Sequence, residues 1–307
     1  MVSFLDKLTN LKVLSLYDTS ITDITGLGSN TNLIEFSISI SLKGSPLTGV
    51  GEINNLTNLT RLYLENLSID SEDLKQITNL NSLKKLSLYG TPLVNLDFIT
   101  NFPNVESLNL YCTGITNFDG ISKLENLKEL LAGGNKETPS PDLTGLAGSN
   151  LLDLILYVER DLDYSELKEI PNLRRLMISA TKENVSVDLS KAFAEENNVT
   201  HIKLMHLDKI IGTNWSNLPN LDLLYLQAND LTKIGNLSGS SLTQLGLAGT
   251  PESGTRNSKI LDSISNLDKL EILEASNLGL SELSNITTFS NLNQVYLYGN
   301  ELSELKG

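Results

Sequence analysis

The chain has 307 residues, 40% of them hydrophobic, and a formal net charge of −14. A single cysteine, Cys112, excludes an intramolecular disulfide framework and a zinc site built from cysteines. Two histidines, His201 and His206, leave little material for a metal centre or a histidine relay, so we expect no cofactor, no metal and no catalysis. The acidity argues against a nucleic-acid partner, because phosphate binding needs a basic face. No apolar run reaches the ~18 residues of a membrane span, so we expect no direct membrane insertion.

A unit of the form L-x-x-L-x-L recurs along the chain. Its first, fourth and sixth positions are apolar in all 13 copies, whose first residues are 21 to 28 positions apart: Leu11, Leu33, Leu59, Leu83, Val105, Leu127, Leu151, Leu173, Val199, Leu221, Leu242, Leu270 and Leu292. This alternation predicts a strand with one buried face in each unit. Such a strand cannot bury its apolar face alone, so we expect the units to stack around one continuous core. The rest of each unit is too short for a full helical crossover and should be extended or form a single helical turn, as at 71–77 and 164–170.

Two polar positions support this register. Asparagine directly precedes the first position in ten units, where it suits a tight turn and can bond neighbouring amides: Asn10, Asn32, Asn58, Asn104, Asn126, Asn150, Asn172, Asn198, Asn220 and Asn291. The ninth position holds Asn or Thr in eight units, and its side chain is expected to satisfy buried backbone groups of adjacent coils: Thr19, Thr91, Thr113, Asn135, Thr181, Asn229, Thr250 and Asn300.

The 22-residue form of the unit, as in LTNLKVLSLYDTSITDITGL, resembles the leucine-rich repeats of internalin-type surface proteins of Gram-positive bacteria. The resemblance covers roughly residues 5 to 307. It implies an α/β solenoid of about 13 repeats, with a parallel sheet on the concave face and short 3-10 or α turns, or extended segments, on the convex face. The units starting at Leu33, Leu173 and Leu242 are longer than the pattern.

Both ends of the chain look cut. Residues 1–10 match the end of a partial repeat, and residues 292–307 read as an incomplete last repeat. We therefore expect a single repeat domain over 1–307, excised from a longer protein whose signal sequence and anchor are not in this chain.

The third, fifth and seventh positions of each unit should face the concave side. Eight of the nine tyrosines fall there, namely Tyr17, Tyr63, Tyr89, Tyr111, Tyr157, Tyr225, Tyr296 and Tyr298, together with Met177 and Met205. None of the seven phenylalanines does. Tyrosine also suits strands, but this segregation is the composition of an interface. Charges nearly balance on this face: five acids, Glu35, Glu65, Glu129, Asp153 and Glu274, stand against four bases, Arg61, Lys85, Arg175 and Lys203.

An apolar patch is expected in the middle of the face. Leu131, Ile155 and Met177 occupy the fifth position of three successive units, and Tyr157 and Met205 flank them. Exposed patches of this kind usually have a partner, which could also be a neighbouring domain of the intact protein. A polar rim should surround the patch, formed by Glu129, Asp153, Arg175, His201 and Lys203.

The remaining candidate residues have plainer interpretations. His201 and His206 read as a surface pair without further metal ligands. Cys112 has no histidine within several units and reads as incidental. Trp215 falls in register with core positions of other units.

These features favour a non-catalytic protein-recognition domain that binds a protein ligand on its concave face as a monomer. The resemblance implies a cell-surface or secreted bacterial protein, with a host receptor as ligand and adhesion as outcome. Two alternatives stay open: an intracellular scaffold or regulatory subunit of the phosphatase-regulator type, and a targeting module of a larger enzyme. A signal sequence and wall anchor in the full-length gene would favour the first hypothesis.

Overall fold

The computed structural model describes residues 5–40, 46–211, 215–231, 234–235, 237, 240–250, 258–264, 267–283 and 286–304. The chain divides into two compact units, Met1–Leu152 and Asp153–Gly307. The predicted long segments of the repeats starting at Leu33 and Leu242 include residues 41–45 and 251–257, which lie outside the described residues, as do 305–307 of the last repeat.

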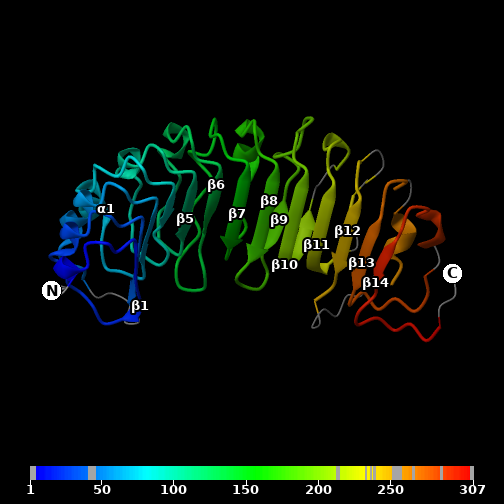
Figure 1. The fold of residues 1–307 in the computed structure, drawn as a ribbon. Coiled ribbons are helices and arrows are strands. Elements are labelled where there is room, and N and C mark those ends of the chain that lie inside the picture. Colours follow the sequence, from blue (N-terminus) through cyan, green and yellow to red (C-terminus); the bar gives the residue numbers. More distant parts are fainter. Residues whose placement is uncertain are drawn as a thin grey trace. The chain divides into compact units, whose positions relative to one another are not determined.

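The first unit is a stack of coils, each contributing one strand to a parallel sheet (Figure 1). The strands follow chain order: β1 (Val13–Thr19), β2 (Glu35–Ile40), β3 (Arg61–Glu65), β4 (Lys85–Ser87), β5 (Ser107–Tyr111) and β6 (Glu129–Gly133). Short helical segments precede β1 or lie between the strands: η1 (Leu5–Lys7), η2 (Leu27–Ser29), η3 (Val50–Asn55), α1 (Ser71–Lys75), η4 (Ile99–Asn101) and η5 (Ile121–Lys123). The expected turn at 71–77 is therefore present as α1, which begins with a capping box at Asp70.

The second unit is built in the same way, from strands that pair in parallel. Its strands are β7 (Asp153–Val158), β8 (Arg175–Ala180), β9 (Ser186–Asp188), β10 (His201–Ile211), β11 (Leu223–Asp230), β12 (Gln244–Ala248), β13 (Ile272–Ser276) and β14 (Gln294–Tyr296). Its turns are η6 (Ser165–Glu169), η7 (Trp215–Asn217), η8 (Ile260–Ser263) and η9 (Ile286–Thr288). β9 pairs with the second half of β10 and was not expected from the sequence.

The repeat pattern sets the strand positions. Thirteen of the described strands begin at the third position of an L-x-x-L-x-L repeat. Equivalent residues of neighbouring strands pair in register, as Leu62 with Leu86 and Leu154 with Leu176. The predicted solenoid of stacked coils is thus confirmed.

Aliphatic side chains from the fourth and sixth positions fill the core, with Leu62, Leu64 and Leu108 among those that are almost fully buried. Burial of such side chains contributes roughly 1.5–3 kcal/mol each to stability. Trp215 is fully buried, as its register predicted. The phenylalanines that the structure describes also lie inside: Phe36, Phe98, Phe102, Phe118, Phe193 and Phe289.

The eighth position of the repeat has left-handed backbone in many coils. Positive φ angles occur there at Asp18, Asn66, Gly90, Cys112, His206, Asn277 and Gly299. Asp, Asn and Gly tolerate this conformation best. Cys112, directly after β5, and His206, within β10, share this backbone conformation.

Asparagine side chains tie each coil to the one before it. Asn32, Asn58 and Asn104 donate from Nδ2 to the carbonyls of Thr9, Thr31 and Asn81 at 2.7, 2.9 and 2.9 Å. This confirms that the asparagine before the first position bonds neighbouring amides.

The ninth position acts in two ways. Thr91 donates across to the Leu64 carbonyl of the preceding coil at 2.8 Å, whereas Thr113 donates to Leu110 of its own coil at 2.9 Å. Asn300 accepts from the Leu278 amide at 3.0 Å. Some ninth-position side chains therefore bond backbone groups of an adjacent coil, as expected, whereas others bond backbone groups of their own coil.

Candidate functional site

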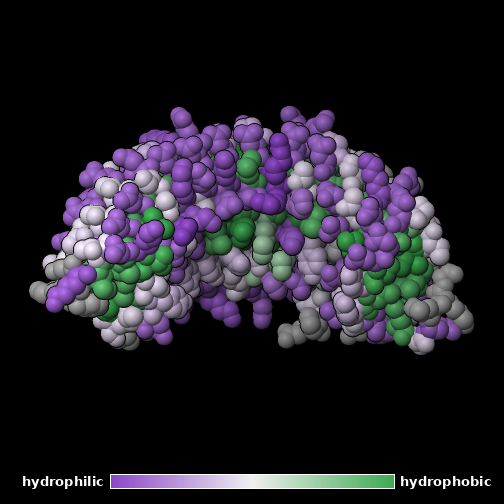
Figure 2. All heavy atoms as spheres, viewed as in Figure 1, coloured by the Kyte–Doolittle hydropathy of each residue, from purple (hydrophilic) through white to green (hydrophobic). Residues whose placement is uncertain are grey.

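The candidate site is the open face, which we define as the strand face formed by the third, fifth and seventh residues of the repeats. Along β3, for example, Leu62 and Leu64 are buried, whereas Arg61, Tyr63 and Glu65 of the open face are half-exposed. Figure 2 shows hydrophobic residues over β7 and β8 with hydrophilic residues around them.

In the first unit the open face carries four tyrosines, two of which are stacked. The rings of Tyr89 and Tyr111 lie 5.6 Å apart between centroids at 18° to each other. Tyr63 is half-buried on β3, and burial together with the charge of Glu35 raises the pKa of its hydroxyl. Tyr17 is 66% exposed on β1, the first strand of the sheet. The face thus presents phenol rings that the solvent reaches.

One ion pair and one hydrogen bond hold three charged side chains on this part of the face. Arg61 Nε donates to Glu35 at 2.5 Å between adjacent strands, and Ser87 donates to Glu65 at 2.5 Å. Lys85 is exposed and has no ion-pair partner among the described residues.

In the second unit, four predicted residues lie side by side in one row. Ile155 on β7 pairs in register with Met177 on β8, Met177 with Lys203 on β10, and Lys203 with Tyr225 on β11. Paired residues on neighbouring parallel strands lie about 4.8 Å apart. Ile155, Met177 and Tyr225 are half-buried, and Lys203 is exposed. Part of the predicted apolar patch, Ile155 beside Met177, is therefore present within this unit, and Lys203 and Tyr225 continue the row.

The seventh-position residues extend this group along the strands. Tyr157 pairs in register with Ser179, and Ser179 with Met205. Ser179 is buried and thus separates the two half-exposed side chains, Tyr157 and Met205.

The polar rim is formed in part by one ion pair. Arg175 donates to both carboxylate oxygens of Asp153, which is the two-point geometry of a strong arginine–carboxylate pair. His201 is half-buried, and its Nδ1 lies 2.8 Å from the Thr200 hydroxyl.

The absence of a side chain at Gly246 leaves room for the Tyr225 ring. A Cβ atom at Gly246 would overlap the Tyr225 ring, so the ring lies over this residue of β12. Burial raises the pKa of the Tyr225 hydroxyl, and the charge of Glu274 adds to this effect. Gly246 was not among the predicted site residues, although glycine at a strand position marks a close approach.

The last coil carries a second exposed tyrosine pair. The rings of Tyr296 and Tyr298 lie 5.9 Å apart at 22°, and Tyr298 is 64% exposed. In the strand order, β12 and β13 separate these rings from Tyr225 on β11.

Two residues predicted for the apolar patch and its rim, Leu131 and Glu129, lie in the first unit. Leu131 is half-buried on β6 of the first unit, and its adjacency to Ile155 stays a prediction. Glu129, also on β6, is exposed.

One polar contact at the open face, between His206 and Ser179, was not expected from the sequence. Nδ1 of the exposed His206 lies 3.0 Å from the hydroxyl of Ser179. Because Ser179 is only 4% exposed, its hydroxyl is not presented to a substrate. Within the described part of the chain, no cluster of three His, Cys, Asp or Glu residues could hold a metal ion.

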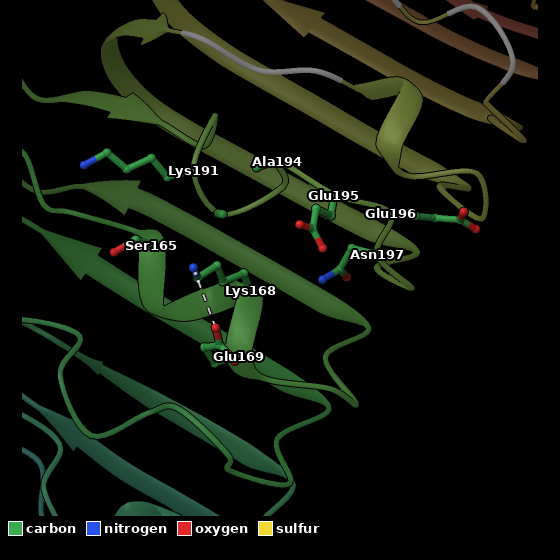
Figure 3. Close-up of a pocket in the computed structure, with 9 residues that line it drawn as sticks. Ser165, Lys168, Glu169, Lys191, Ala194, Glu195, Glu196 and Asn197 are labelled. Carbon is green, nitrogen blue, oxygen red and sulfur yellow. Dashed lines mark ion pairs between the residues drawn. The ribbon is translucent and has the colours of Figure 1, made fainter.

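A separate pocket lies away from the open face, between η6 and residues 191–197 (Figure 3). Its volume is about 480 Å³, and its lining carries charges of both signs. Lys168 Nζ lies 3.7 Å from Glu169 Oε1. Glu195 and Asn197 face the pocket, and Glu196 points away from it. This mixture favours no single class of ligand.

Solved structures share this fold. An internalin from Listeria monocytogenes is 20% identical, with a TM-score of 0.66 over 98% of this chain and 84% of that chain. The chain has the fold of an internalin-like leucine-rich-repeat protein. The predicted resemblance to internalins is therefore confirmed for the fold.

More distant leucine-rich-repeat structures are also similar. The complex of Toll with Spatzle from Drosophila is 15% identical, with a TM-score of 0.61 over 94% of this chain and 40% of that chain. The complex of TLR13 with ssRNA13 is 18% identical, with a TM-score of 0.51 over 98% of this chain and 56% of that chain. No protein-family model and no curated protein matches the sequence. Among the described residues, no helix has the length and apolar character needed to cross a membrane.

Proposed function

We propose that this leucine-rich-repeat domain, residues 1–307, is a non-catalytic protein-recognition domain whose ligand binds the open face. One observation carries the proposal: the tyrosines gather on the open face, whereas the described phenylalanines are in the core. Tyrosine offers a large apolar ring with a hydroxyl at its end, which suits a surface that is wet when free and covered when bound. Tyr164, the tyrosine outside this set, is buried, and burial raises the pKa of its hydroxyl.

The mechanism of recognition follows from the rigidity of the sheet. Strand pairing fixes the spacing of Ile155, Met177 and Tyr225, so little conformational entropy is lost when a ligand covers them. The Asp153–Arg175 pair satisfies two charges in advance and leaves the apolar side chains as the anchoring groups.

The likeness to an internalin supports a place at the cell surface or outside the cell, with adhesion to a host protein as the outcome. The complex of Toll with Spatzle supports binding by this fold in general. We propose that the domain acts as a monomer. A signal sequence and wall anchor in the parent gene would agree with this location; an intracellular gene product would contradict it.

A capture experiment tests the recognition surface. The purified chain and a Tyr157→Ala/Met177→Ala variant would be used side by side to capture partners, and the affinity of each captured partner would then be measured. Loss of these anchors should weaken binding by about 2 kcal/mol, or roughly 30-fold.

A matched control is available in Leu8→Ala/Val94→Ala. Both side chains are apolar and exposed, Leu8 at 46% and Val94 at 72%, and both lie off the open face. This variant should bind like the wild type. Equal affinity of the wild type and the Tyr157→Ala/Met177→Ala variant, with folding intact by circular dichroism, would contradict the proposal.

A further inference from the structure

The open face between β7 and β11 has a charge of opposite sign to the molecule. The third, fifth and seventh residues of the repeats that form these strands include the charged side chains of Asp153, Arg175 and Lys203. Asp153 and Arg175 neutralise each other through their two-point contact. Lys203 is exposed, and the described residues include no ion-pair partner for it. One uncompensated cation therefore remains on this face of a chain whose net charge is −14.

Three of the residues around Lys203 are apolar, whereas His201 lies two residues before it on β10. Met177 lies beside it on β8, Tyr225 beside it on β11, and Met205 two residues further along β10. A ligand that covers Met177 and Tyr225 would also remove water from the ammonium group of Lys203. Burial of an unpaired charge is costly, so a ligand without an anionic group at this point would be penalised.

The rest of the chain limits what kind of anion can bind. A ligand with a broadly acidic surface would be repelled by the net charge of −14. A single carboxylate at Lys203 gains the short-range pairing without this long-range penalty.

We propose that the ligand of this surface is an extended protein segment that places an Asp or Glu carboxylate on Lys203 and an aliphatic or aromatic side chain on Ile155 and Met177. The inference rests on the proposed protein-recognition function and names the chemistry of its ligand. Ile155 lies two strands from Lys203, about 10 Å away. An extended chain advances about 3.3 Å per residue, so the acidic and apolar residues should be within about three positions of each other.

Selection from a library of random displayed peptides tests this inference. The purified chain would be the bait, and peptides that also bind the Tyr157→Ala/Met177→Ala variant would be discarded. The remaining peptides should carry Asp or Glu within about three positions of an aliphatic or aromatic residue. Selection on a Lys203→Glu variant should replace this acidic preference with Lys or Arg.

A selected peptide then gives a quantitative measurement. Its affinity should fall at least about tenfold for Lys203→Glu and should recover when its acidic residue is exchanged for lysine. Lys85→Glu is the matched control, because Lys85 is an exposed lysine of the open face on β4 without an ion-pair partner among the described residues. This control should keep the acidic preference.

The outcomes separate the two proposals. Peptides that depend on Tyr157 and Met177 but show no acidic preference, or the same preference with Lys203→Glu, would overturn this inference alone. Failure to select any peptide that depends on Tyr157 and Met177 would overturn both this inference and the proposed function.

Discussion

Cys112 occupies a backbone position that favours other residues. Its φ angle is 60°, and the equivalent eighth position of other coils holds Asn66, Gly90 and Asn277 with the same left-handed backbone. For a residue other than glycine this conformation costs roughly 1–2 kcal/mol, and a β-branched side chain fits it worst. The strand end thus depends on backbone tolerance more than on side-chain chemistry.

Cysteine already bears this cost and a β-branched side chain adds to it, so we expect Cys112→Val to lower the free energy of unfolding by about 1 kcal/mol. Cys112→Asn should change it less, because asparagine accepts left-handed backbone. Urea unfolding followed by circular dichroism measures both. If the valine variant were as stable as the asparagine variant, the backbone explanation would be wrong.

At the same scale, the sequence predicted which residues lie on the open face but not how their side chains rest there. The period-two alternation places Tyr225 and Tyr89 on this face regardless of rotamer. The position of the Tyr225 ring over Gly246, and the stacking of Tyr89 on Tyr111, depend on side-chain torsions that spacing does not determine.

Hydrogen bonds between coils differ in burial, and their contributions should differ accordingly. Thr91 is fully buried and donates to the Leu64 carbonyl of the preceding coil, whereas Asn58 is exposed and donates to the Thr31 carbonyl. A buried acceptor that loses its donor cannot turn to water, but an exposed one can.

Thr91→Val should therefore lower the free energy of unfolding by about 1.5 kcal/mol, and Asn58→Ala by only about 0.5 kcal/mol. Urea titrations of the two variants and the wild type would give these values. Thr113→Val serves as a comparison, because its hydroxyl is also buried but bonds within its own coil. A larger loss for Asn58→Ala than for Thr91→Val would contradict the role of burial.

Strand positions were predictable because apolar residues recur at fixed places in each repeat. β9 was not, because its three residues, Ser186–Asp188, include one buried apolar side chain, Val187, and form a strand only through pairing with Lys209–Ile211. Local pattern contains no information about that tertiary pairing. The second half of β10 could not be predicted for the same reason: the strand continues past the left-handed residue His206 to Ile211, where it pairs with β9.

For the whole molecule, charge decides between partner classes that the fold leaves open. One similar structure is a complex with ssRNA and another is a complex of Toll with Spatzle, so the solenoid itself does not select the class of ligand. The net charge of −14 favours a ligand other than RNA, because RNA binding requires cations that neutralise phosphates. The open face has isolated lysines, Lys85 and Lys203, in separate units, and its arginines Arg61 and Arg175 are paired with carboxylates.

We therefore expect no measurable binding of single-stranded RNA to this chain at physiological salt. Fluorescence anisotropy with a labelled oligonucleotide would test this over a range of salt concentrations. Lowering the salt should not produce binding, since reduced screening strengthens the repulsion between the acidic chain and the phosphates. Binding that appears at low salt and weakens as salt is added would reveal a phosphate-binding surface, and it would contradict the assignment of the open face to a protein ligand.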